Sequence, residues 1–287
     1  MTANLPKYLY RYMAFPFEPD SQIAQEKIKR LKALFVNSHF YMVSPLWFND
    51  PFDCKAFLTL EGCHETYWKE RIQQYFLAMA KKIRGVKGKR IIQQKMFNGY
   101  DDDKKAYEEW LESSSENMHR NLLPLTGILS FSESPRNILM WSHYSDSHKG
   151  LCVQIDTATI KMDERKLLHK VEYCDGYPTM KEYICKSKEG DPLNATRMFL
   201  SRKSKAWEYE REWRLIVTSK DMRTVINEPF EFHQNSLSSV ILGCDISDQN
   251  KKTLENWVSE RGCPLKIYHA VRSKSRYAID IDGLPEK

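Results

Sequence analysis

The sequence predicts an α+β fold in which a mixed, mainly antiparallel sheet carries a helical insertion. Short segments of β-branched and aromatic residues lie near both ends of the chain, whereas residues 65–123 are mostly helical in character. Hydrophobic residues make up 41% of the 287 positions and aromatic residues 12%, which is ample for a core. No linker rich in proline or serine flanks the central segment. We therefore expect one domain over residues 1–287, with the insertion at about residues 64–123.

Three elements are expected before the insertion. Residues 9–13 are rich in aromatic residues and predict an opening strand. Apolar residues recur near helical spacing between residues 21 and 36, and Ser21 is a suitable N-cap for this helix. Residues 39–43 predict a second strand, which the sequence Ser44-Pro45 ends.

Strands dominate after the insertion. We expect them over residues 126–132, 150–156, 171–173, 207–218, 239–243 and 265–271. One helix is expected to end near Ser204, and another to cover residues 247–261. The sequence contains neither an internal repeat nor a low-complexity segment.

The net charge and the cysteine pattern limit the classes of protein to which the chain can belong. The net charge of +6 is compatible with nucleic acid or a phosphate-bearing ligand, and two dense basic runs lie at residues 81–90 and 202–205. Such runs are also typical of solvated helix ends and loops. The seven cysteines are irregularly spaced without zinc-site patterns, which predicts free thiols in a reducing cytoplasm and no metal site. No apolar run reaches membrane length and the first residues lack a signal-peptide pattern, so we expect a soluble cytoplasmic protein with no membrane partner.

The segment at residues 207–214 (WEYEREWR) carries glutamates at every second position and runs into the apolar sequence Leu215-Ile216-Val217. The period of two predicts a strand on which Glu208, Glu210 and Glu212 face the same side. Three like charges on one face cost stability unless a cation or a shared proton compensates for them. An ordinary surface strand can carry the same pattern, so this segment alone leaves both interpretations open.

Two further segments combine residue types that core packing does not require. Residues 44–53 (SPLWFNDPFD) predict a turn-rich loop, for which a rigid Asx turn is the structural interpretation. Residues 130–144 (SFSESPRNILMWSHY) place hydroxyl groups at a strand end, followed by a short helix. Trp141 and Tyr144 are expected to face the core, and a lone histidine such as His143 is most often structural.

Several common catalytic and nucleotide-binding motifs do not occur in the sequence. It contains no glycine-rich dinucleotide motif, no P-loop and no nucleophile elbow. Cys152 lies within an apolar strand and is therefore a poor candidate nucleophile.

Four motifs together resemble an uncharacterised prokaryotic family, a domain of unknown function. They are LYRY at residues 9–12, FNDPFD at residues 48–53, MWSHY at residues 140–144 with the following Lys149-Gly150, and the W-x-x-E-x-E-x-R pattern at residues 207–214. The motifs occur in order across about residues 8–217, and the FNDPFD hexapeptide is quite specific. This resemblance implies no assigned activity.

A second resemblance, to ADP-ribosyltransferases of the Arg–Ser–Glu type, does imply one. Those enzymes carry an arginine on the first strand, a serine-rich strand end and a Glu-x-Glu sequence that leads into a strand. Here the matching positions are Arg11, the sequence Ser130-Phe131-Ser132, and the pair Glu210 and Glu212. Residues 131–140 also resemble a stretch of the DNA-modifying transferases of toxin–antitoxin systems. The resemblance implies a split, mainly antiparallel sheet, although the middle motif departs from Ser-Thr-Ser and the insertion is unusually long.

By this resemblance the chain is an NAD-dependent ADP-ribosyltransferase, an enzyme of the glycosyltransferase class whose substrate is NAD. Glu212 would hydrogen-bond the ribose 2′-hydroxyl and stabilise an oxocarbenium-like transition state, and Glu210 would align or deprotonate the acceptor. Arg11 would grip the diphosphate or ribose. The remaining residues expected around NAD, which order the site or stack on nicotinamide, are Tyr41, Ser44, Trp47, Asn49, Asp50, Ser130, Ser132 and His143.

The resemblance implies a toxin or phage-defence effector whose acceptor is nucleic acid or protein and whose further partner is an antitoxin protein. The basic runs favour single-stranded RNA or DNA as the acceptor. One alternative is a non-enzymatic module for binding nucleic acid or a partner, with salt-sensitive binding and no NAD turnover. Another is a nuclease with Asp50, Asp53, Glu210 and Glu212 as magnesium ligands. A requirement for divalent ions would identify the nuclease, because the transferase needs none.

Overall fold

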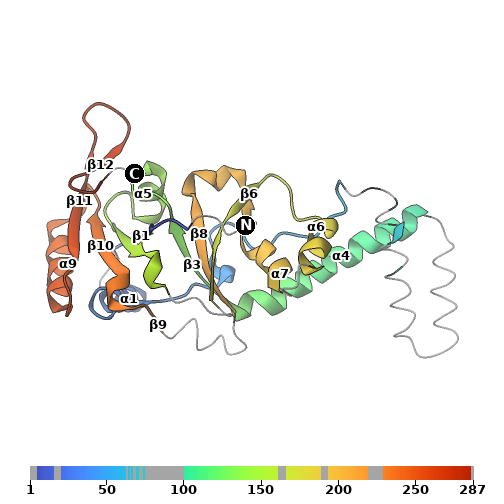
Figure 1. The fold of residues 1–287 in the computed structure, drawn as a ribbon, viewed down its shortest axis with the longest axis horizontal. Coiled ribbons are helices and arrows are strands. Elements are labelled where there is room, and N and C mark those ends of the chain that lie inside the picture. The colour runs from blue at the N-terminus through green and yellow to red at the C-terminus, as the bar shows by residue number, and fades with distance from the viewer. Residues whose placement is uncertain are drawn as a thin grey trace. The chain divides into compact units, whose positions relative to one another are not determined.

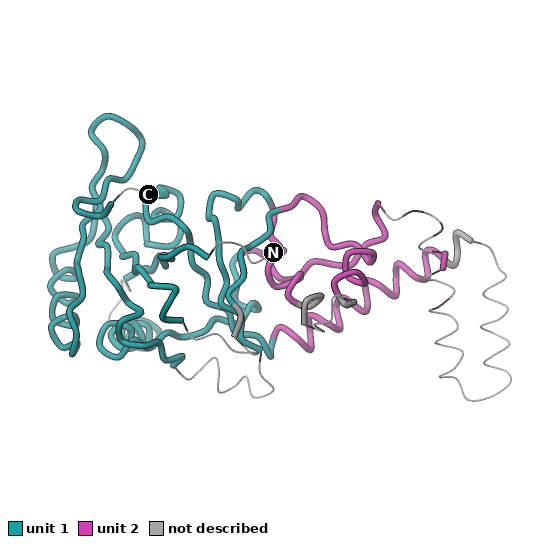
Figure 2. The backbone as a smooth tube through the Cα atoms, viewed as in Figure 1, with its two compact units in different colours: residues 1–49, 124–173, 205–287 teal, residues 50–123, 174–204 magenta. Residues whose placement is uncertain are grey.

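The computed structural model describes residues 5–15, 21–62, 64, 66, 69–70, 74, 100–160, 166–188, 193–218 and 229–285. The chain forms two compact units (Figure 2). Unit 1 comprises residues 1–49, 124–173 and 205–287, and unit 2 comprises residues 50–123 and 174–204. The predicted α+β class with a mixed, mainly antiparallel sheet is confirmed. Among the helices of these described ranges, none is long and apolar enough to cross a membrane.

Unit 1 is built on an eight-stranded sheet (Figure 1). Its strands, in spatial order, are β12 (Ile279–Ile281), β11 (Lys266–Arg272), β10 (Leu237–Leu242), β4 (Leu151–Asp156), β1 (Tyr8–Met13), β3 (Thr126–Ser132), β8 (Glu212–Thr218) and β5 (Lys166–Lys170). Neighbouring strands are antiparallel except for β10 and β11, which are parallel. The first strand of the chain therefore lies inside the sheet, between β4 and β3.

Shorter elements complete unit 1. The α-helices are α1 (Gln22–Asn37), α5 (Ile138–Tyr144) and α9 (Asp248–Glu260). The short 3-10 helices are η1 (Pro45–Trp47), η3 (Thr157–Thr159), η4 (Lys205–Glu210) and η5 (Gln234–Ser236). β2 (His39–Phe40) pairs with β9 (Phe230–Glu231). The predicted cap of α1 is confirmed, because Ser21 Oγ accepts a hydrogen bond from the Ala24 N–H at 3.1 Å. Two elements span the boundaries between the units along the chain, η2 (Leu123–Leu125) and β6 (Glu172–Cys174).

Each face of the large sheet buries a hydrophobic cluster of its own. Leu9 of β1 belongs to a cluster that includes Leu34 of α1 and Trp257 of α9. Its neighbour Tyr10 belongs to a second cluster, with Trp141 of α5. Successive side chains of a strand point to opposite faces, so α1 and α9 cover one face and α5 covers the other. Each fully buried large side chain contributes about 1.5–3 kcal/mol, which holds both layers on the sheet.

Unit 2 is mainly helical in its described part. It contains α4 (Tyr100–Leu122), α6 (Met180–Lys188), α7 (Leu193–Leu200) and the short strand β7 (Arg202–Ser204). Ala56 and Phe199 are buried in its core, and the buried Lys203 forms an ion pair with the buried Asp53 at 3.4 Å. The helix α4 confirms the helical character of the predicted insertion over residues 100–122. The basic run at residues 81–90 lies outside the described residues.

The predicted strand over residues 207–218 is wrong in its first half. Residues 205–210 form η4, Arg211 has a left-handed φ of 47°, and β8 begins only at Glu212. The three glutamates therefore do not share one strand face: Glu208 is exposed, whereas Glu210 and Glu212 are buried. The predicted helix that ends near Ser204 in fact ends at Leu200 and is followed by β7.

The reason lies in the loop that follows β3. Ser132, the last residue of β3, donates a hydrogen bond from Oγ to the Glu210 carbonyl oxygen at 2.7 Å. Asn137 Nδ2 donates to the Tyr209 carbonyl oxygen at 2.6 Å. Side chains thus satisfy carbonyl groups that a longer β8 would have paired with a neighbouring strand, and the chain can turn before the sheet.

Candidate active site

Three neighbouring strands bring together the arginine, the serines and a glutamate expected from the sequence. β1, β3 and β8 lie side by side in the sheet (Figure 1). Tyr10 of β1 pairs with Ser132 of β3, and Ser132 pairs with Glu212 of β8. Arg11 follows Tyr10 directly, so its main chain lies only two strand spacings of about 5 Å each from that of Glu212, about 200 positions away in sequence. Its side chain leaves β1 on the face of Leu9, opposite to the face that Tyr10, Ser132 and Glu212 share.

The edge of β3 that faces β1 changes partner along its length. Ser132 pairs with Tyr10, whereas Ile128 forms two backbone hydrogen bonds with Val43, of 2.9 and 3.0 Å. Ser130 lies between these two pairings, and its carbonyl oxygen accepts a hydrogen bond from Arg11 Nη1 at 2.8 Å. The sheet is therefore divided at this point, and the guanidinium group occupies the gap.

The guanidinium group of Arg11 is shielded from solvent. Burial lowers the pKa of Arg11 to about 10, and the nearby negative charge of Glu212 acts in the opposite direction. A pKa of about 10 still leaves the guanidinium group protonated at neutral pH. Arg11 thus provides a fixed positive charge near Glu212, in the gap between β1 and β3.

Glu212 forms a two-point ion pair with Arg214 on the same face of β8. Arg214 Nε lies 2.8 Å from Glu212 Oε1, and Arg214 Nη2 lies 2.9 Å from Oε2. The side chain of Arg214 is 0% exposed and that of Glu212 is 5% exposed. The ring of Phe48 covers the guanidinium carbon at 5.5 Å. The Glu212 N–H donates to Tyr173 Oη at 2.8 Å, so both the main chain and the carboxylate of this residue are fixed.

Glu210 is held by a different set of groups. Tyr144 of α5 donates a hydrogen bond from its hydroxyl group to Glu210 Oε1 at 2.6 Å. Burial raises the pKa of Tyr144, and the negative charge of Glu210 raises it further, whereas a hydrogen bond with Asn49 acts in the opposite direction. Tyr144 is therefore a protonated donor at neutral pH. The expectation that Tyr144 faces the core holds only in part, since its hydroxyl group contacts a carboxylate.

The loop before residue 50 supplies part of the same cluster. Ser44 Oγ caps η1 by accepting a hydrogen bond from the Leu46 N–H at 3.3 Å. Phe48 and Asn49, the first two residues of the FNDPFD motif, contact Arg214 and Tyr144 as described above. Trp47 projects beside them with 80% of its surface exposed.

Other residues expected around NAD have different environments. The Tyr41 ring is covered by the Arg30 guanidinium group of α1, at 4.7 Å. His143 is exposed, with its ring 6.4 Å from that of Tyr144. Asp50 belongs to unit 2, where its Oδ1 accepts a hydrogen bond from the Phe52 N–H at 2.9 Å. This is the geometry of the Asx turn that the sequence offered as the structural interpretation.

The ligand set of the nuclease alternative is divided between the two units. Asp50 and Asp53 belong to unit 2, whereas Glu210 and Glu212 belong to unit 1. Across the part of the chain that the structure describes, no three His, Cys, Asp or Glu side chains are grouped as a metal site would require.

No functional role was predicted from the sequence for three residues of this cluster, namely Arg214, Tyr144 and Tyr173. The signal for Arg214 was available, because an acid and an arginine two residues apart on a strand share one face. No local signal identifies the two tyrosines, since their partners lie 66 and 39 positions away in the sequence.

One family model matches the chain, over residues 140–215, and is described as a protein of unknown function (DUF2971). The matched segment contains the MWSHY and W-x-x-E-x-E-x-R motifs, so the predicted resemblance to an uncharacterised domain family is confirmed over these residues. No curated protein and no solved structure matches the chain. The resemblance to ADP-ribosyltransferases stays a prediction.

Proposed function

We propose that the protein is a cytoplasmic NAD-dependent ADP-ribosyltransferase that acts as a prokaryotic toxin or phage-defence effector. One observation supports this proposal above all others. Arg11, the serines of β3 and Glu212 lie on three neighbouring strands, and Ser132 donates a hydrogen bond to the main-chain carbonyl oxygen of Glu210. A cation for a diphosphate and carboxylates for a ribosyl cation are thus held within one region of unit 1.

The reaction begins with cleavage of the bond between the ribose and nicotinamide. The bonding electron pair leaves with nicotinamide, and positive charge develops on the ribose. A preorganised carboxylate stabilises this charge. Arg214 binds both oxygens of Glu212 and fixes the carboxylate, yet a carboxylate has about four acceptor sites. In this proposal the carboxylate of Glu212 also accepts a hydrogen bond from the ribose 2′-hydroxyl.

The second half of the reaction joins the ribose to an acceptor nucleophile. In this proposal Glu210 accepts the proton that the nucleophile loses as its new bond to the ribose forms. The hydrogen bond that Tyr144 donates to Oε1 orients the carboxylate of Glu210 for this role. Arg11 holds the diphosphate of NAD. We propose single-stranded nucleic acid as the acceptor, a protein as the second candidate acceptor, and an antitoxin protein as a partner.

A second function has its own supporting observation. Both carboxylates are almost fully buried and already have partners, as in a structural polar network. A non-enzymatic module that binds nucleic acid or a partner protein would need no exposed carboxylate in this region.

Nicotinamide release from NAD, measured with cellular RNA, DNA and protein as acceptors, distinguishes the transferase from the binding module. Under the transferase proposal, Glu212→Gln lowers the rate by about 10²–10³-fold, because a charge-stabilising group is lost. The matched control is Glu208→Gln, a change at an exposed position of the same motif. It should leave the rate unchanged. If the wild-type protein releases no nicotinamide with any acceptor, the transferase proposal is refuted and the binding module is favoured.

A further inference from the structure

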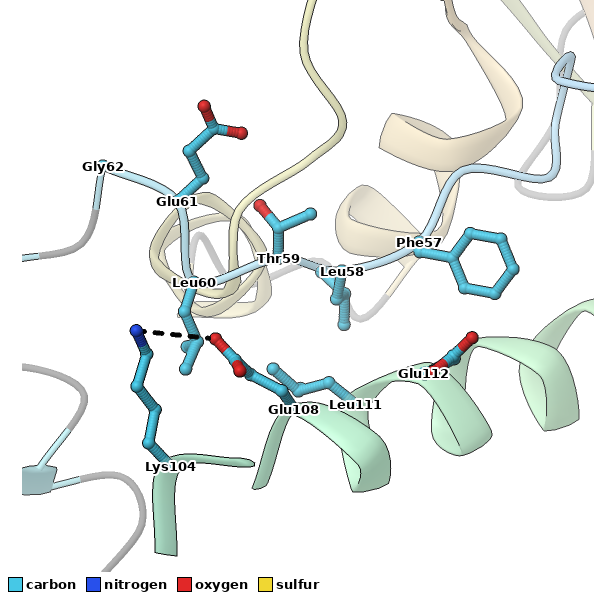
Figure 3. A pocket seen from close by; sticks show the side chains of 10 residues that line it. All are labelled: Phe57, Leu58, Thr59, Leu60, Glu61, Gly62, Lys104, Glu108, Leu111 and Glu112. Carbon is cyan, nitrogen blue, oxygen red and sulfur yellow. Dashed lines mark ion pairs between the residues drawn. The ribbon is translucent and has the colours of Figure 1, made fainter. Parts of the chain in front are cut away.

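Unit 2 contains an open groove of about 590 Å³, between one face of α4 and residues 57–62, a segment that is extended as far as Leu60 and then turns (Figure 3). This volume is typical of ligand-binding sites in proteins. Leu58 and Leu60 point from the extended segment toward α4, and Leu60 and Leu111 are buried. The groove therefore has an apolar floor. The residues that α4 contributes recur at helical spacing and are Lys104, Glu108, Leu111 and Glu112.

One wall of the groove is an open strand edge. Thr59 forms an isolated parallel bridge with Thr179 on one edge of the extended segment. Main-chain groups of alternate residues face the other edge, where the Leu58 N–H donates to Ser115 Oγ at 3.1 Å. Leu60 is the next residue on this second edge, and its N–H and C=O have no hydrogen-bond partner among the described residues. An unpaired edge inside a groove suits the addition of an extended peptide.

The opposite wall is acidic. Residues 100–122 contain seven Asp and Glu residues against three Lys and Arg, although the whole chain has a net charge of +6. Glu108 forms an ion pair with Lys104 at 3.8 Å. Glu112 is exposed, has no ion-pair or hydrogen-bond partner within the described part of the chain, and lies in the half of the groove that Phe57 lines (Figure 3). A carboxylate next to an aromatic ring favours a cationic group.

We propose that this groove binds an extended basic segment of a protein partner. The main chain of the segment pairs with Leu60, and an apolar side chain covers Leu58 and Leu111. A lysine or arginine lies between Glu112 and Phe57. Main-chain pairing supplies affinity, and the acidic and aromatic wall selects the side chain. This proposal concerns unit 2 alone and does not depend on the transferase chemistry of unit 1.

The test uses the whole 287-residue chain and a fluorescein-labelled six-residue peptide of alternating leucine and arginine. Binding is followed by fluorescence anisotropy. We expect saturable binding that weakens at least tenfold when glutamine replaces each arginine, because charge-assisted hydrogen bonds are lost. Methylation of alternate peptide nitrogens should also weaken binding at least tenfold. Hydrogen exchange should slow at residues 57–62 when the peptide binds.

Two matched variants locate the site. Glu112→Gln should weaken binding of the arginine peptide about tenfold. Glu109→Gln removes a charge that is also exposed, on the same helix but outside the residues that line the groove, and should have no effect. Absence of saturable binding, equal effects of the two variants, or unchanged binding of the methylated peptide would each overturn the proposal. In the last case the acidic helix merely attracts cations without pairing along the strand edge.

Discussion

The buried pair of Glu212 and Arg214 yields the sharpest stability prediction. Replacing Arg214 with methionine keeps most of the side-chain volume but leaves the Glu212 carboxylate buried without its guanidinium partner. Two hydrogen bonds of 2.8 and 2.9 Å are lost at a position that is 0% exposed for the arginine side chain. Removing one partner of such a pair costs about 3–5 kcal/mol, a large part of the 5–15 kcal/mol typical of a folded protein.

Part of the lost stability should return when the charge of Glu212 is removed as well. Replacing a whole buried ion pair with apolar residues is often neutral, so we expect the double variant Glu212→Leu, Arg214→Met to recover at least half of the lost stability. The coupling energy of the double-mutant cycle should therefore be about 2 kcal/mol or more.

Urea unfolding, together with hydrogen exchange of the β8 amides, measures both effects in unit 1. Amides of β8 that exchange through unfolding should exchange about 10²–10³-fold faster in Arg214→Met. A decrease in unfolding free energy below about 1 kcal/mol for this single variant would refute the reasoning, because an unpaired buried carboxylate is strongly destabilising.

Two further predictions concern acid stability and backbone packing. Hydrogen bonds from Arg202 lower the pKa of Glu182 to about 2, so this pair stabilises the folded state above a pH of about 4.3 and the contribution is lost as pH falls toward 2. Arg202→Gln should reduce that acid dependence in urea unfolding measured across this pH range, and an unchanged profile would contradict the assignment. At Gly243, a Cβ atom would lie 2.0 Å from the His148 carbonyl oxygen, so Gly243→Ala should cost about 3 kcal/mol or more. Gly262→Ala, where no atom lies within 4 Å, should leave the melting temperature nearly unchanged, and equal effects of the two alanines would argue against the close approach.

The elements that the sequence predicted well have local determinants. The helix α1 combines an apolar face with the side chain of Ser21 as its cap, and both signals lie within the segment itself. The strands β3 (TGILSFS) and β4 (LCVQID) each have an apolar centre of strand length. The strands β5 and β12 went unpredicted because β12 is only three residues long and β5 carries little alternation.

The prediction that was wrong near the site, the strand over residues 207–211, was overridden by groups that are distant in the sequence. The alternation of residues 207–213 is a genuine strand signal, but hydrogen bonds from Ser132 and Asn137 hold residues 209 and 210 in η4. Those donors lie 78 and 72 positions away, so no local pattern contains them. The adjacency of Arg11 and Glu212 was expected only from the order of motifs in a resembling family. It follows here from the strand order β1, β3, β8.

The central position of β1 also governs when the protein can fold during its synthesis. Tyr10 pairs with Ser132 of β3, which the ribosome adds 122 residues later, and β4 and β8 are made later still. At typical elongation rates of about 5–20 residues per second, the first strand partner of β1 is therefore synthesised roughly 6–24 s after β1 itself. During that interval its main-chain groups are open to chaperones and to other nascent chains. The candidate site is thus assembled only after most of the chain has left the ribosome.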